Sequence, residues 1–117
     1  MFKMQDCIFC KIITGELPGQ IVHRDEFVTA FRDIHPVAPT HILIVPNRHI
    51  ASTNDLTAED QALAGHMLTV VAQIAGQEGI QDSGYRLIVN TGLHANQVVF
   101  HLHLHLIGGQ RLRYPMG

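Results

Sequence analysis

Two stretches of the chain have different hydrophobic periods, and together they predict a mixed fold of helices and strands. Residues 101–106 read His-Leu-His-Leu-His-Leu, an alternation with the period of two that is typical of a β-strand. In residues 61–76 the apolar side chains return at helical spacing instead. That stripe comprises Leu63, Met67, Val70, Val71 and Ile74. We expect it to pack as core, with neighbouring His66 as a solvated helix residue.

Shorter apolar runs predict four further strands. They are residues 21–24, 27–31, 41–46 and 85–90. The first two read as a hairpin, because the acidic pair between them is typical of a turn. The run of residues 41–46 is rich in β-branched side chains and favours a buried strand.

Capping and breaking residues predict where the helices begin and end. Residues 7–14 fit a short helix that Gly15 can close. Thr57 and Asp60 have the spacing of a capping box at the start of the long helix. The two prolines in residues 33–40 require a loop. We therefore expect one α+β domain over residues 1–117, with a mostly antiparallel five-stranded meander, one long helix and one short helix.

Composition narrows the possible partners of this domain. The 117 residues are enough for one modest core, and the formal net charge is only −2. Because basic residues nowhere run beyond a pair, a nucleic-acid groove is not expected, and a small ligand fits better. No apolar run approaches the ~20 residues of a membrane span, and the N-terminus lacks a signal-peptide core. We expect a cytoplasmic protein.

Cys7 and Cys10 form a Cys-x-x-Cys pair, and they are the only cysteines in the sequence. In a reducing compartment such a pair is a metal half-site, a redox pair or two free thiols rather than a structural disulfide.

The alternating histidines are the strongest chemical signal. Same-face residues on a strand lie ~6.5–7 Å apart, so a phosphorus could face one imidazole while its leaving group faces the next. His101 and His105 would lie ~13 Å apart, too far to close easily on one ion. A neutral imidazole is a nucleophile or base, and only His103 has a histidine on each side. Two alternatives stay open: a zinc site using His101, His103 and a third ligand, and a polar face without chemistry.

Residues 101–107 resemble the His-φ-His-φ-His-φ-φ motif, with φ apolar, that defines the histidine triad family. Further blocks resemble its Hint branch in the same order along nearly the whole chain. These blocks are residues 8–18, 30–41, 45–50, 85–92 and 108–117.

The resemblance implies a homodimer that binds purine nucleoside monophosphates such as AMP and GMP. It implies slow hydrolysis of purine nucleoside phosphoramidates through a nucleotidyl-histidine intermediate, with no cofactor or metal in the chemistry. His103 matches the nucleophile, and His105 matches the histidine on the phosphate and leaving-group side. His101 and His41 match histidines that orient or support the nucleophile. A nucleotide-binding or partner-binding module with vestigial activity is the alternative.

Nucleotide-binding positions are carried over from the same resemblance. Asp33 matches the carboxylate that accepts hydrogen bonds from the ribose hydroxyls, and Asn90 and Gln97 match polar contacts near the phosphate. The base pocket would be apolar. Its matching positions are Ile8, Phe9, Ile12, Leu17, Phe31, Ile34 and Leu43.

The chain departs from the family at three positions. Asn96 and Val98, in the nucleotide-binding loop before the triad, replace a glycine and a hydroxyl residue, and Tyr114 replaces a tryptophan. Without a hydroxyl at position 98, we expect amine leaving groups, which have a high proton affinity, to be favoured over phosphate leaving groups.

Some microbial relatives carry a structural zinc site away from the phosphate. Its ligands here would be Cys7, Cys10, His49 and His101. Two free thiols in a short helix are the alternative to this site.

Overall fold

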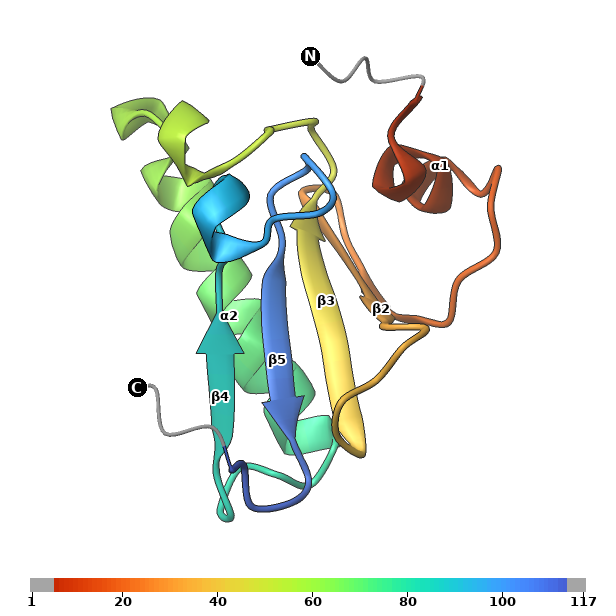
Figure 1. The fold of residues 1–117 in the computed structure, drawn as a ribbon, viewed down its shortest axis with the longest axis vertical. Coiled ribbons are helices and arrows are strands. Elements are labelled where there is room, and N and C mark those ends of the chain that lie inside the picture. Colours follow the sequence, from red (N-terminus) through yellow and green to blue (C-terminus); the bar gives the residue numbers. More distant parts are fainter. Residues whose placement is uncertain (1–5, 114–117) are drawn as a thin grey trace.

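Five antiparallel strands form one sheet in the computed structural model, which describes residues 6–113 (Figure 1). The strands are β1 (Ile21–Arg24), β2 (Val28–Arg32), β3 (Thr40–Pro46), β4 (Tyr85–Ile88) and β5 (Leu104–Gly108). The helices are α1 (Ile8–Thr14) and α2 (Gln61–Gln77), with short 3-10 turns η2 (Thr53–Asp55), η3 (Ala58–Asp60) and η4 (Leu93–Ala95). The predicted α+β class, strand number and helix number are confirmed, with boundaries shifted by one or two residues at most elements.

The order of the strands differs from the expected meander. It is β1-β2-β3-β5-β4, so the last strand in sequence inserts between β3 and β4. Because β3 and β4 both pair antiparallel with β5, they run parallel to each other. Two parallel strands of one sheet need a long crossover connection, and α2 lies in the connection from β3 to β4.

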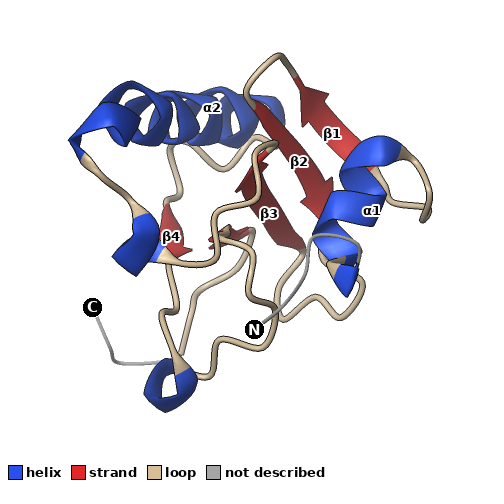
Figure 2. Ribbon diagram, turned by 90° about the horizontal axis from the view of Figure 1, so that it is seen from above, coloured by secondary structure: helices blue, strands red, loops and turns tan. Residues whose placement is uncertain are grey.

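Helix α2 covers one face of the sheet, and Figure 2 shows the strands lying between α2 and α1. Met67, Val70, Val71 and Ile74 of the predicted stripe are buried against the sheet, whereas Leu63 is only partly buried. This cluster forms the larger of two apolar cores. Among the described residues, no helix is long and apolar enough to cross a membrane.

Helix α1 packs on the opposite face. Side chains alternate along a strand, so Leu43 and Val45 of β3 point away from α2 and meet Phe9 of α1 together with Phe31 of β2. The helix ends as predicted, because Gly15 adopts φ 87° and its N–H bonds to the carbonyl of Ile12.

The predicted capping box is present before α2, but a 3-10 turn separates it from the helix. Thr57 and Asp60 form a complete capping box, but the box opens the 3-10 turn η3, which leads into α2.

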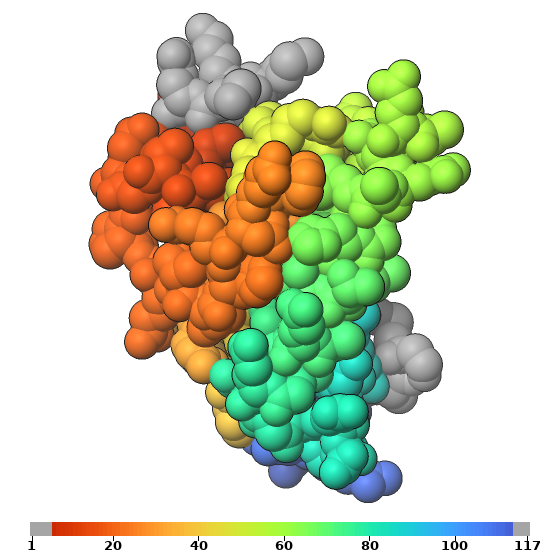
Figure 3. Space-filling view, turned by 180° about the vertical axis from the view of Figure 1, so that it is seen from behind, coloured from red at the N-terminus to blue at the C-terminus, as the bar shows by residue number. Residues whose placement is uncertain are grey.

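A carboxylate joins α2 to the turn between β1 and β2. One oxygen of Asp25 accepts hydrogen bonds from Nε2 of His23 and Nε2 of His66, both at 2.7 Å. Figure 3 shows this hairpin turn lying against the helix. The expectation that His66 is merely a solvated helix residue was therefore wrong.

The histidine strand is shorter than the sequence pattern indicated. In the pairing of β3 with β5, Ile44 lies opposite Leu104, so Pro46 would face Leu102 if the ladder continued. Proline has no N–H to donate, and the N–H of Leu102 bonds instead to the carbonyl of Ile50 at 2.6 Å. His101 and His103 therefore lie just before β5, and only His105 of the three lies within it.

Candidate active site

The candidate site occupies the sheet face opposite α2, where β5 and the first residues of β3 lie side by side. Leu43 pairs with His105 and His41 pairs with Ile107, so both strands contribute histidines to one area. The rings of His103 and His105 have centroids 5.0 Å apart. The predicted juxtaposition of these two imidazoles is confirmed.

The orientation of His103 is held by the backbone of His101. Its Nδ1 lies 2.7 Å from the carbonyl oxygen of His101. A carbonyl oxygen can only accept, so Nδ1 carries the proton and Nε2 of the neutral ring keeps its lone pair. Burial lowers the pKa of His103, with opposing contributions from this hydrogen bond and from Asp33. The ring is therefore neutral at neutral pH, the state that a nucleophile requires.

A chain of hydrogen bonds sets the tautomers of the next two rings. The backbone N–H of Val37 donates to Nδ1 of His41 at 3.1 Å, so the proton of neutral His41 is on Nε2. That Nε2 lies 3.0 Å from Nδ1 of His105. It donates there, so the proton of neutral His105 is on Nε2. Asp33 lies 3.4 Å from Nε2 of His41 and is a second acceptor for it.

The two rings in this chain are neutral for the same reason. Burial lowers the pKa of His41, and it lowers the pKa of His105 to about 4, although Asp33 acts in the opposite direction on both. A neutral His105 can donate a hydrogen bond to a phosphate oxygen but is a poor general acid.

The geometry assigns the supporting contacts differently from the sequence prediction. His41 contacts His105 rather than the nucleophile candidate. His101 does support His103, but through its backbone carbonyl, because its ring points elsewhere. Sequence reasoning missed the role of Val37, since a backbone N–H leaves no mark in a sequence.

The ring of His101 belongs to a cluster with Cys7, Cys10 and His49. Its Nε2 donates to the carbonyl of Pro46 at 2.8 Å, and its Nδ1 lies 3.3 Å from Sγ of Cys7 and 3.5 Å from Sγ of Cys10. Nδ1 of His49 lies 3.3 Å from Sγ of Cys10. All four ligand atoms lie within 4.8 Å of one another. The four predicted metal ligands are therefore brought together.

Without a metal, the thiol of Cys10 in this cluster is protonated at neutral pH. Burial raises the pKa of Cys10 to about 12, and neighbouring Cys7 adds to the effect. Among the described residues, His101 and His103 do not share a metal-binding group, which disfavours a zinc site built on that pair.

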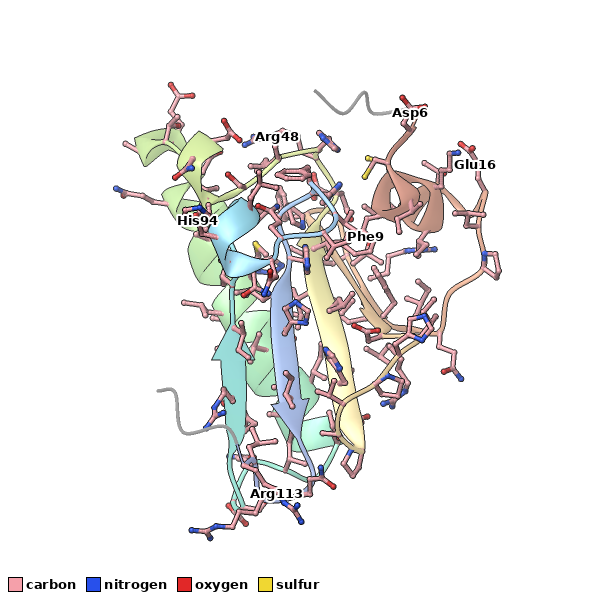
Figure 4. The ribbon with its side chains drawn as sticks, in the orientation of Figure 1. Asp6, Phe9, Glu16, Arg48, His94 and Arg113 are labelled. Atoms are coloured by element: carbon pink, nitrogen blue, oxygen red, sulfur yellow. The ribbon has the colours of Figure 1, made fainter. Side chains whose placement is uncertain are left out.

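The predicted base-pocket residues divide into buried and exposed positions. Phe9, Phe31 and Leu43 are buried, and Ile12 packs against them, beside the histidines. The ring centroid of Phe9 lies 5.1 Å from that of His103 in an edge-to-face arrangement. Figure 4 labels Phe9 between α1 and the sheet. Three other predicted positions are exposed on the surface. They are Ile8, Leu17 and Ile34, the last at 84% exposure.

The loop before the histidines is braced by Gln97. Its buried amide accepts from Gly92 N–H and donates to the carbonyls of Ala51 and Val99. Asn96 adopts φ 59°, the left-handed conformation that asparagine tolerates better than most residues, which explains how it can replace glycine. Val98 is 80% exposed. Asn90 lies just beyond β4, and Tyr114 is outside the described residues.

The chain matches one family model and several known proteins along nearly its whole length. Residues 6–113 match the family model described as "Scavenger mRNA decapping enzyme C-term binding". The chain is 56% identical over 108 residues to the purine nucleoside phosphoramidase of Escherichia coli K12, covering 92% of this chain and 91% of that protein. It is 50% identical over 113 residues to an uncharacterized HIT-like protein of Synechococcus elongatus, covering 97% and 98% of the two chains.

Two solved structures share the whole fold. A HIT family hydrolase of Legionella pneumophila superposes with a TM-score of 0.92 at 45% identity, covering 95% of this chain and 99% of that one. A HIT family hydrolase of Clostridium thermocellum superposes with a TM-score of 0.94 at 41% identity, covering 97% and 99%.

Proposed function

The chain belongs to the histidine triad family, and we propose that it hydrolyses purine nucleoside phosphoramidates through a covalent nucleotidyl-histidine intermediate. That the chain is a hydrolase follows from its relatives. One observation carries the proposed chemistry: the hydrogen bond from Nδ1 of His103 to the carbonyl of His101 leaves Nε2 as an unprotonated, oriented nucleophile.

The first step would exchange one P–N bond for another. Nε2 of His103 attacks the phosphorus, the bond to the leaving amine breaks, and the amine nitrogen takes a proton from water. Nε2–H of His105 would donate to a phosphate oxygen and stabilise the charge that develops there. In the second step a water oxygen bonds to phosphorus, the Nε2–P bond breaks, and the proton of that water returns to solvent. One water is consumed, and a nucleotide and an amine are released.

The proposed nucleotide is a purine monophosphate such as AMP or GMP. The apolar group around Phe9, Phe31 and Ile12 lies beside His103 and offers a flat slot for a base. Asp33 would accept hydrogen bonds from the ribose hydroxyls. Amine leaving groups should be favoured over phosphate leaving groups, because the exposed Val98 supplies no hydroxyl.

Mass spectrometry of quenched enzyme tests the intermediate. After a single turnover with adenosine 5′-phosphoramidate, we expect a nucleotidyl adduct on His103. His103→Gly should abolish turnover yet keep AMP binding, measured by calorimetry, because it removes the attacking imidazole and leaves the base slot and Asp33 in place. An adduct on His105, or full activity in the variant, would falsify the assignment. Nucleotide binding without turnover by the unmodified protein would instead support a binding module with vestigial activity.

We further propose that Cys7, Cys10, His49 and His101 hold a structural zinc ion. Two sulfurs and two imidazole nitrogens are a common donor set for zinc, and the hydrogen bond of His101 to Pro46 leaves Nδ1 free to bind it. Four protein ligands leave no open position, so the ion would hold α1 against the sheet and take no part in hydrolysis.

Metal analysis of the purified protein tests this site. We expect about one zinc per chain, and we expect Cys7→Ser to lower both the zinc content and the unfolding midpoint. Cys7→Ser protein that keeps a full complement of zinc would show that the site is wrongly assigned.

A homodimer is the assembly that we propose. Strand β4 lies at one edge of the sheet, with Tyr85 and Leu87 partly exposed, and an unprotected edge favours pairing with another strand. Location in the cytoplasm stays a prediction. The free thiols of Cys7 and Cys10 agree with a reducing compartment.

A further inference from the structure

The carboxylate of Glu78 bonds to two strands of the sheet at once. Both terminal nitrogens of Arg32, the last residue of β2, donate to it, Nη1 to Oε1 at 3.0 Å and Nη2 to Oε2 at 2.8 Å. The hydroxyl of Thr40, the first residue of β3, donates to Oε1 at 3.4 Å. These three residues, which we call the Glu78 clamp, tie the end of one strand to the start of the next.

The end of α2 holds this carboxylate in place. Glu78 follows the last residue of the helix, and its N–H bonds to the carbonyl of Ile74 at 2.8 Å. Gly79 then adopts φ 73° and ends the helical turn. The hydrogen bonds from Arg32 lower the pKa of Glu78, so its carboxylate is charged at neutral pH. A charged, bidentate pair of this kind is both strong and directional.

The Glu78 clamp lies on the sheet face opposite the candidate active site. Side chains alternate along a strand, and Arg32 and Thr40 fall on the face that packs under α2. Their chain neighbours Asp33 and His41 therefore fall on the site face. The backbone N–H of Asp33 also bonds to the carbonyl of His41 at 2.9 Å. Each residue that Glu78 holds is thus adjacent in the chain to a residue of the site.

The clamp closes the base of the loop formed by residues 33–39. This loop supplies Asp33, whose Oδ2 lies 3.4 Å from Nε2 of His41, and Val37, whose N–H bonds to Nδ1 of the same ring. The N–H of His35 bonds to Oδ1 of Asp33 at 2.8 Å, but this contact lies within the loop and does not join it to the sheet. The loop contains no strand or helix, so its position depends on where its two ends are fixed.

We propose that Glu78 is a positioning residue that acts through Asp33. By holding Arg32 and Thr40 at a fixed separation, the clamp keeps the Asp33 carboxylate where it can accept hydrogen bonds from the ribose hydroxyls. Glu78 lies on the α2 face of the sheet, so it acts without touching the nucleotide. The inference rests on the proposed nucleotide-binding function and adds a residue that sets the preference for ribose.

Two substrates isolate this effect. They are adenosine 5′-phosphoramidate and its 2′,3′-dideoxy counterpart, which differ only in the hydroxyls that Asp33 would bind. We expect kcat/KM of the wild type to favour the ribose compound at least about tenfold, because hydrogen bonds to a charged group are strong. Glu78→Gln should reduce this ratio about three- to tenfold, because the carboxylate of Asp33 is misplaced. The loss should fall on KM of the ribose compound and leave the dideoxy compound nearly unchanged.

Further variants separate positioning from a loss of stability. Arg32→Gln should lower the ratio as Glu78→Gln does, and Arg32→Lys, which keeps the charge but not the planar fork, should give an intermediate value. Asp60→Asn is the matched control, because it makes the same carboxylate-to-amide change in the ion pair of Asp60 with Arg48. That variant should lower the midpoint of thermal unfolding but keep the wild-type ratio. A wild-type ratio in Arg32→Gln would overturn the clamp.

Combination with Asp33→Asn shows whether the effect passes through Asp33. The ratio in Asp33→Asn/Glu78→Gln should be no lower than the ratio in Asp33→Asn alone, because the two changes remove the same contact. A further fall in the double variant would overturn the inference. An equal loss on both substrates in Glu78→Gln would also overturn it, since Glu78 would then have a structural role only.

Failure of the proposed function gives a different result. If adenosine 5′-phosphoramidate is not hydrolysed, the function fails, and the clamp is then read from calorimetry with AMP and 2′,3′-dideoxy-AMP. A preference for AMP in Kd that Glu78→Gln reduces supports the clamp. An equal preference in both proteins, or no preference in the wild type, overturns it.

Discussion

At the residue scale, burial rather than neighbouring charge determines the protonation of the site. Asp33 favours the charged form of His41, His103 and His105, yet desolvation is the largest influence on each ring and lowers all three pKa values. Neutral rings in fixed tautomers are what a nucleophile and a hydrogen-bond donor require. The same burial makes the site sensitive to acid.

His105 predicts a loss of stability at low pH. Its pKa is about 4 in the folded protein against 6.5 for the ordinary residue, so below pH 6.5 the unfolded chain binds the proton first. Above pH 6.5 His105 should therefore cost no stability. Between pH 6.5 and pH 4 its protonation in the unfolded chain should lower the unfolding free energy by about 1.4 kcal/mol per pH unit. Urea denaturation at pH 5 and pH 7 should show a smaller difference in His105→Asn than in the wild type. An identical difference in both proteins would contradict the prediction.

At the element scale, a close contact joins the end of α2 to the strands that carry the site. A Cβ on Gly108 of β5 would lie 2.9 Å from Cδ1 of Ile80 and 3.2 Å from Cβ of Tyr85. Ile80, three residues beyond the end of α2, and Tyr85 at the start of β4 therefore pack directly on the β5 backbone. This contact holds β5, and with it His105, in register between its neighbours.

Gly108→Ala should lower the unfolding free energy by about 1–3 kcal/mol, because the added methyl overpacks this contact. Gly65→Ala is the control, since a Cβ at that exposed helical position meets nothing within 4 Å. That variant should be stabilised by about 0.5–1 kcal/mol through the higher helix propensity of alanine. Thermal or urea unfolding measures both, and equal stability of Gly108→Ala and the wild type would show that the contact yields without strain.

At the scale of the whole molecule, the two edges of the sheet differ. Strand β1 lies at one edge, where Arg24 donates to the carbonyl of Ile13 in α1, and β4 lies at the other edge with Tyr85 and Leu87 exposed. Pairing through β4 would cover these two side chains. The family resemblance places the dimer contact at a sheet edge.

Sedimentation at micromolar concentration should show a dimer. Leu87→Lys places a charge on the β4 edge and should shift the protein toward monomer. Ile21→Lys is the matched control, because Ile21 has the same 37% exposure but lies on β1 at the opposite edge. A wild-type protein that sediments only as a monomer would refute the dimer, and dissociation by the β1 substitution alone would assign the contact to the other edge.

The sequence by itself determined the features that depend on neighbours along the chain. The period of two near residue 104 and the helical stripe from Met67 to Ile74 predicted a strand and a helix that the structure contains. Gly15 and the Thr57–Asp60 capping box marked helix ends, because caps are made by residues three or four positions apart.

Only the tertiary structure decided which distant residues meet. Insertion of β5 beside β3 brings His41 against His105, and residues 64 positions apart leave no periodic signal of their contact. Strand β5 begins only at Leu104 because Pro46 of β3 would lie opposite Leu102. The alternation within residues 101–106 carries no information about which residue of β3 lies opposite. The cluster of Cys7, Cys10, His49 and His101 likewise depends on α1 packing against the sheet, because its members come from three separate stretches of chain.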